Sequence, residues 1–192
     1  MRNYARVVPT VILALGLAAC GDEKPKVDEN AETGLTETEP MEGEYSTSVE
    51  LIGNEGESVG AVELIQKENG VMVKLQAEGL PPGPHGIHFH EKGTCETPDF
   101  ESAGGHFNPT DASHGLEHDE GPHAGDLPNI EVSEDGTIDT EFLAKNVTLT
   151  LGDDNSLLQE GGTALVIHAG EDDGKSQPSG DSGERIVCGE IK

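Results

Sequence analysis

Tryptophan is absent from the 192 residues, and the chain has only two tyrosines and four phenylalanines. A core must therefore be built from Val, Ile, Leu and Ala, and we expect it to be modest in size. Cations are also scarce, because 11 Lys and Arg face 38 Asp and Glu, which gives a formal net charge of −27. This balance excludes a nucleic-acid-binding protein that works by neutralising phosphates. It also argues against direct docking on anionic lipid headgroups.

The first 20 residues differ from the rest of the chain. Residues 1–6 are basic and residues 7–19 are mostly apolar, but the apolar stretch is too short to span a bilayer comfortably. This pattern predicts a signal peptide over residues 1–19. The sequence Leu17-Ala-Ala-Cys20 resembles the lipobox of bacterial lipoproteins, which implies acylation of Cys20 and an exported protein held at the cell envelope, on the outer face of the cell membrane or on the periplasmic side. The alternative is an ordinary secretory signal in which Cys20 is incidental.

Residues 20–44 form the next unit. After Cys20, this stretch holds nine acidic residues and two lysines, and few large apolar residues. It cannot bury enough surface to offset the entropy of the chain, so we expect a disordered tether that charge repulsion keeps extended.

From Tyr45 to Lys192 the pattern predicts short strands. Apolar and polar residues alternate with period two, and Asn69-Gly70 between two such runs indicates a hairpin. The expected strands are residues 48–52, 59–65, 71–77, 87–91, 129–132, 137–143, 164–169 and 185–191. Eight short strands and no convincing helix predict an all-β, antiparallel sandwich or barrel. Two long loops, residues 92–127 and 170–184, interrupt the strands, and loops of that length are typically functional.

The histidines supply a reason for these loops. Seven of the eight lie between His85 and His123. His88 and His90 are two residues apart on a strand, so both rings can reach one metal. His106, His114, His123 and Asp126 lie on the first long loop and make a closed tetrahedral set for zinc. His168 ends an apolar strand that can bring it to the same region, and four imidazoles would suit Cu(II).

Five segments resemble copper–zinc superoxide dismutase of the bacterial exported type. They are His85-Gly-Ile-His-Phe-His90, Gly104-Gly-His-Phe-Asn-Pro109, Gly121-Pro-His-Ala-Gly-Asp-Leu-Pro128, Val166-Ile-His168 and Gly183-Glu-Arg-Ile-Val-Cys-Gly189. The resemblance runs from about Tyr45 to Lys192 and covers every segment that supplies metal ligands in that family. It implies a Greek-key β-barrel in which the two long loops build the active site.

The resemblance also implies a role for individual residues. The copper ligands would be His88, His90, His106 and His168, and the zinc ligands would be His106, His114, His123 and Asp126, so that His106 bridges the metals. Asp172 would link a copper ligand to a zinc ligand, with Asp173 as a competitor for this role. Arg185 would attract a small anion beside the copper. Apart from the resemblance, Lys175 on the same loop is a second candidate for this attraction. Cys95 and Cys188 would form a disulfide, His85 would be structural, and His118 would be a solvated residue that could also compete for zinc.

The implied activity is the disproportionation of superoxide to oxygen and hydrogen peroxide, with copper cycling between Cu(II) and Cu(I), zinc in a structural role, and His106 as the proton carrier beside Arg185. Two other functions remain open at this point, a redox-inactive metal-binding member of the same fold and a lipoprotein that stores or delivers copper. Family members differ in their assembly, so a monomer and a homodimer are both compatible with the resemblance.

Overall fold

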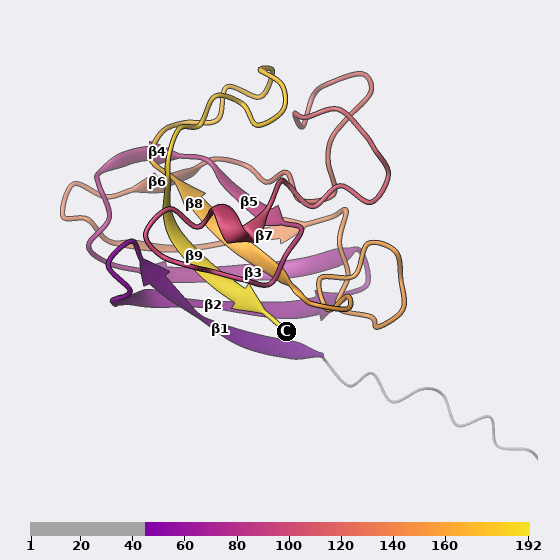
Figure 1. Ribbon diagram of the computed structural model, residues 1–192, viewed down its shortest axis with the longest axis horizontal. Helices are drawn as coiled ribbons and strands as arrows, with labels where there is room; N and C mark the ends of the chain where they lie inside the picture. Colours follow the sequence, from indigo (N-terminus) through magenta and orange to yellow (C-terminus); the bar gives the residue numbers. More distant parts are fainter. Residues whose placement is uncertain (1–44) are drawn as a thin grey trace, which may run out of the picture. The chain divides into compact units, whose positions relative to one another are not determined.

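The computed structural model describes residues 45–192, and the expected signal peptide, Cys20 and the tether lie outside this part of the chain. Its elements are β1 Ser46–Gly53, β2 Ser58–Lys67, β3 Gly70–Ala77, β4 Gly83–His85, β5 Ile87–His90, the 3₁₀ helix η1 Glu101–Ala103, β6 Ile130–Val132, β7 Ile138–Ala144, β8 Thr163–His168 and β9 Arg185–Ile191. Seven strands form an antiparallel sheet in the order β5-β8-β9-β1-β2-β3-β7, which curls into a half-barrel (Figure 1). The predicted all-β fold is confirmed.

Strand β3 shows why this sequence forms a half-buried sheet. Val73, Leu75 and Ala77 are buried, whereas Lys74 and Gln76 between them are exposed, so successive side chains face the core and the solvent. The hairpin expected at Asn69-Gly70 is present, because β2 pairs with β3 from Lys67 opposite Gly70 onward. Within residues 45–192, no tyrosine lies in the main core, whose buried members are mostly Val, Leu and Ile.

Strand β8 carries a continuous apolar run because both of its faces are covered. Leu165 and Ile167 belong to the main core. Ala164 and Val166 point to the opposite face, where they join a smaller buried cluster with Phe100 and Cys188. The first long loop therefore packs on the outside of β8 and β9, and does not hang free of the barrel.

One strand goes beyond the eight that the sequence predicts. The short strand β4, Gly83–His85, pairs with β6 in a separate two-stranded sheet. Its sequence, Gly-Pro-His, has no apolar alternation, and proline is ordinarily excluded from strand interiors, so periodicity could not reveal it.

The connections of the sheet place the two long loops together. Residues 91–129 follow β5 and residues 169–184 follow β8, and β5 and β8 are neighbouring strands. Figure 1 shows both loops rising from the same end of the half-barrel. Within residues 45–192, no helix has the length and apolar character needed to cross a membrane.

Candidate metal centre

Four imidazoles converge at the base of the two long loops. His88 and His90 lie on β5, His168 ends β8, and His106 comes from the first loop, and one ring nitrogen of each lies within 4.8 Å of the others. These nitrogens are His88 Nδ1 and the Nε2 atoms of His90, His106 and His168, and all four are buried without a hydrogen-bond partner. Buried polar atoms are nearly always paired, so four unpaired lone pairs at one point fit a copper ion.

The second nitrogen of the rings explains their orientation. His90 Nδ1 donates to the carbonyl of Gly104 at 2.9 Å, and His168 Nδ1 donates to that of Gly183 at 3.2 Å. His88 donates from Nε2 instead, to the Asp172 carboxylate at 2.6 Å. Each hydrogen bond fixes the tautomer, so that the lone pair of the other nitrogen faces the shared point.

A second set adjoins the first. The Nδ1 atoms of His106, His114 and His123 lie 3.0, 3.1 and 3.2 Å from one carboxylate oxygen, Asp126 Oδ1. The other oxygen, Asp126 Oδ2, accepts from the backbone N–H groups of Gly115 and His123. Three imidazole nitrogens and one oriented carboxylate make a closed four-ligand set, which fits a structural zinc ion.

His106 belongs to both sets through different atoms. Its Nδ1 faces the zinc set and its Nε2 faces the copper set. Its ring stacks on that of His88 with centroids 3.9 Å apart. A single imidazole is thus placed to bind both metals, one on each nitrogen.

The electrostatics of the two sets differ. Burial lowers the pKa of His168 to about 3 and that of His106 to about 4, and lowers that of His90 well below its usual value. These rings are therefore neutral at pH 7, with lone pairs free for a metal. Burial also opposes charge on His114, but hydrogen bonds to Asp126 and Asp172 outweigh it and raise the pKa of His114 to about 9. The same hydrogen bonds hold the pKa of both carboxyl groups well below the usual range, against the effect of burial.

Asp172 connects the two sets. It accepts from His88 Nε2 at 2.6 Å and from His114 Nε2 at 3.0 Å. Asp173 does not compete, because its carboxylate accepts from Lys175 and Ser176 within its own loop. Gly180 makes room for the link: a Cβ there would lie 1.9 Å from Asp172 Oδ1, and its φ of +68° favours glycine.

Two amide side chains hold the loops against each other. The Gln177 amide, on the second loop, pairs with the backbone N–H and C=O of His114 at 2.8 and 2.9 Å. In the opposite direction, the Asn129 amide pairs with the backbone N–H and C=O of Asp172 at 3.0 and 2.8 Å. Both loops are thereby fixed by contacts within the protein itself.

Residues 58–191 match the family model described as copper/zinc superoxide dismutase. The chain belongs to this family. It is 51% identical over 150 residues to superoxide dismutase [Cu-Zn] 1 of Aquifex aeolicus, an alignment that covers 78% of this chain and 89% of that protein. It is 42% identical over 185 residues to the superoxide dismutase-like protein YojM of Bacillus subtilis, covering 94% of this chain and 92% of that protein.

Solved structures give the same result for this member of the copper–zinc superoxide dismutase family. A superoxide dismutase-like protein from Bacillus subtilis superposes with a TM-score of 0.73 at 44% identity, over 76% of this chain and 97% of that one. The Cu/Zn superoxide dismutase from Brucella abortus superposes with a TM-score of 0.64 at 29% identity, over 77% and 100%. This chain carries both metal sites of the family.

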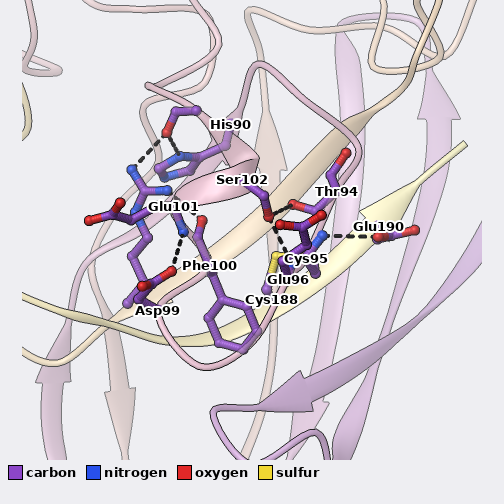
Figure 2. The surroundings of a disulfide bond; sticks show 12 residues. His90, Thr94, Cys95, Glu96, Asp99, Phe100, Glu101, Ser102, Cys188 and Glu190 are labelled. Carbon is purple, nitrogen blue, oxygen red and sulfur yellow. Dashed lines mark hydrogen bonds between the residues drawn. A yellow bond between two sulfur atoms is a disulfide. The ribbon is translucent and has the colours of Figure 1, made fainter.

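Arg185 lies beside the copper set. It lines a cavity of about 380 Å³ together with His90, His106 and His168. Its Nη1 donates to Phe100 O at 2.6 Å and its Nη2 to Gly104 O at 2.7 Å. A disulfide joins Cys95 to Cys188, and so ties the segment that supplies these carbonyls to β9 (Figure 2). Sequence patterns did not suggest the two carbonyls, since backbone acceptors leave no mark in a sequence.

Three further residues lie outside the two sets. Lys175 is not a second cation at the copper cavity, because it lines a separate cavity of about 430 Å³ with His118 and Asp173. Its loop turns it toward the zinc side. His118 Nδ1 accepts from the backbone N–H of Glu120 and belongs to neither ligand set. His85 is buried and lies between the carbonyls of Pro81 and His168, which is a structural position.

We expect Asp126→Ala to lower zinc affinity by at least about 100-fold, because the variant loses one ligand and the group that orients three imidazoles. Copper should still bind, since Asp126 is not in the copper set. The zinc and copper contents after dialysis against increasing concentrations of a chelator measure both affinities. Asp173→Ala removes a nearby carboxylate that contacts no ligand and should leave zinc affinity unchanged. Equal zinc retention in the two variants would remove Asp126 from the ligand set.

Proposed function

We propose that this protein disproportionates superoxide to oxygen and hydrogen peroxide at the copper site, with zinc in a structural role, and that it works as an exported lipoprotein. The observation that carries the activity is the convergence of four unpartnered, buried imidazole nitrogens in a cavity that Arg185 also lines. When bound there, copper supplies the one-electron exchange.

The side chains of the protein bind and orient the substrate. Arg185 is permanently charged, and two of its five N–H donors are used by Phe100 O and Gly104 O. The remaining donors can hold a small anion in the copper cavity. Within residues 45–192, no other lysine or arginine lines that cavity. The attraction of superoxide to the site therefore depends on Arg185 and on the metal charges.

His106 is the residue placed to move a proton. Its Nε2 lies in the copper set and its Nδ1 in the zinc set, and the ring borders the copper cavity. With Nδ1 directed at the zinc set, Nε2 is the nitrogen of this ring that can take up a proton and release it. Reduced superoxide would need this proton and a second one from solvent to leave as hydrogen peroxide. Asp126 and the stacked ring of His88 keep the imidazole in this orientation.

Two observations support an exported protein. The Cys95–Cys188 disulfide is of a kind that persists in oxidising compartments. The first 20 residues have the order of a lipoprotein signal, ending in Leu17-Ala-Ala-Cys20. An acyl anchor at Cys20 would hold the domain at a membrane that its acidic surface would not bind by itself.

We expect His168→Ala to reduce dismutase activity by at least about 100-fold while zinc is retained, because His168 contributes only to the copper set. Superoxide decay and metal content, measured on the same preparation, test this. His118→Ala removes a histidine of the first loop that belongs to neither set, and should retain both activity and metals. Loss of zinc in step with activity in His168→Ala would show that the sites are not divided in this way. Full activity in that variant would refute the proposed function.

Cys20→Ala should block acylation and move the protein from the membrane fraction to the soluble or secreted fraction. Metabolic labelling with a fatty-acid analogue and cell fractionation measure the two effects. Thr10→Ala alters the apolar stretch and keeps Cys20, so it should remain labelled and membrane-bound. A Cys20→Ala protein that still fractionates with membranes would exclude the lipid anchor.

The salt dependence of the rate should reflect two opposing charges. Residues 45–192 hold 29 Asp and Glu against seven Lys and Arg, a formal charge of −22, which repels superoxide at long range. Arg185 attracts it at short range. The Debye length falls to about 10 Å at 0.1 M salt, so low salt concentrations screen mainly the long-range repulsion. We expect the rate to rise or stay level up to about 0.1 M NaCl, and to fall above that concentration.

The Arg185→Ala variant provides the control for this experiment. It should be slower at every salt concentration and should lack the fall at high salt, because the local attraction is gone. Superoxide decay against NaCl concentration measures both proteins. A steep fall from the lowest salt in the unmodified protein would mean that local attraction dominates throughout.

A further inference from the structure

Phe100 has a backbone conformation that its side chain disfavours. Its φ and ψ are 54° and 23°, in the left-handed region, immediately before η1. Within residues 45–192, the other non-glycine residues with positive φ are Asp111 and Asp181, which belong to a residue type that tolerates this region. A bulky residue in this conformation is strained, and such strain persists only where the surroundings impose it.

The ring of Phe100 is the part that its surroundings hold. It is completely buried, in a small cluster with Ala103, Ala164, Val166 and Cys188 on the outer face of β8 and β9. Figure 2 shows the ring beside the disulfide and pointing away from His90. The carbonyl of the same residue accepts from the Arg185 guanidinium. The free energy gained by burying the ring therefore offsets the cost of the backbone conformation. The side chain and the carbonyl of this residue face different parts of the molecule.

The left-handed turn directs the carbonyl of Phe100. Its N–H donates to Glu96 O at 3.0 Å, and its C=O accepts from Ala103 N at 3.1 Å. The same C=O accepts from Arg185 Nη1 at 2.6 Å. Four residues later, Gly104 O accepts from both Arg185 Nη2 and the copper ligand His90. A single turn thus holds the guanidinium at two points and a copper ligand at one.

We propose that Phe100 is a positioning residue for Arg185. Its buried ring fixes the left-handed turn, and the turn sets where the guanidinium stands in the copper cavity. The disulfide fixes only the start of this segment, at Cys95, five residues before the carbonyl. The role in catalysis rests on the proposed function, whereas the placement of Arg185 can be tested without any metal.

Comparing Phe100→Val with Phe100→Leu separates the effect of the left-handed turn from the effect of losing buried apolar surface. Both variants keep a medium-sized apolar side chain in the cluster. Valine is branched at Cβ and resists the left-handed conformation, whereas leucine is unbranched there. If the turn matters, Arg185 should be released in the valine variant and largely held in the leucine variant. If only burial matters, the two variants should behave alike.

The first readout is the rate at which phenylglyoxal modifies Arg185 in the metal-free protein, followed by mass spectrometry of the peptide that contains it. Arg185 is the only arginine after Arg6, so the site of modification is unambiguous. Phenylglyoxal reacts at the Nη atoms, and both are engaged by carbonyls here. We expect modification to be at least threefold faster in Phe100→Val, and within about 1.5-fold of the unmodified protein in Phe100→Leu.

Leu75→Ala is the matched control for simple destabilisation, because Leu75 is fully buried in the main core on β3 and does not belong to the Phe100 cluster. It should lower the melting temperature and leave the modification rate unchanged. If Phe100→Val does not fold, Phe100→Ala serves instead, since it removes the ring that anchors the turn. Equal modification rates in the unmodified protein and the valine or alanine variant would overturn the proposal, as would an equal rise in Leu75→Ala.

Dismutase activity gives the second readout. In the metal-loaded protein, Phe100→Val should shift the rate and its fall at high salt toward those of Arg185→Ala, with copper and zinc content unchanged. A rate and salt profile identical to the unmodified protein would contradict the role of the turn in catalysis. If the unmodified protein shows no dismutase activity at all, the proposed function fails, and the modification rates still decide whether Phe100 positions Arg185.

Discussion

The Asp172 carboxylate is the contact on which the geometry of both metal sets depends. It accepts from Nε2 of His88 in the copper set and from Nε2 of His114 in the zinc set, whose Nδ1 faces Asp126. Its hydrogen bonds choose the tautomer of each ring, and so decide which nitrogen is left for a metal. The loop that carries it must therefore be held in place, and the amide of Asn129 and the side-chain-free Gly180 do this.

The strand framework contributes the remaining precision. His88 and His90 take their common direction from the pleat of β5, and His168 arrives from the adjacent strand β8, so three of the four copper-facing rings belong to paired strands. Only His106 comes from a loop, and it is the ring shared with zinc. Three rings fixed by the sheet are thus completed by a fourth, whose position depends on the zinc set and on the contacts between the loops.

Much of this arrangement could be predicted from the sequence, for reasons that differ by residue. The alternation around Val73 and Leu75 indicated a strand, and the H-x-H spacing of His88 and His90 indicated a shared metal. Contacts made by the backbone were not predictable in this way. The carbonyls of Phe100 and Gly104 that hold Arg185 depend on a left-handed turn, and phenylalanine does not signal such a turn. The sequence likewise did not show that Lys175 faces away from the copper cavity, because the residues on both sides of it are polar. Its direction depends on how the loop packs.

The site must attract an anion within a domain whose formal charge is −22. Two divalent ions would bring four positive charges to the two sets, and Asp126 and Asp172 return two negative ones, so that the centre remains positive even when His106 is a deprotonated bridge. Neither carboxylate lines the copper cavity, because both are turned toward the zinc side, whereas Arg185 does line it. The two carboxylates that orient the ligands therefore lie on the far side of the rings from the copper cavity, whereas the Arg185 guanidinium lines that cavity. That separation, and not the charge of the whole domain, determines what an anion meets when it enters the cavity.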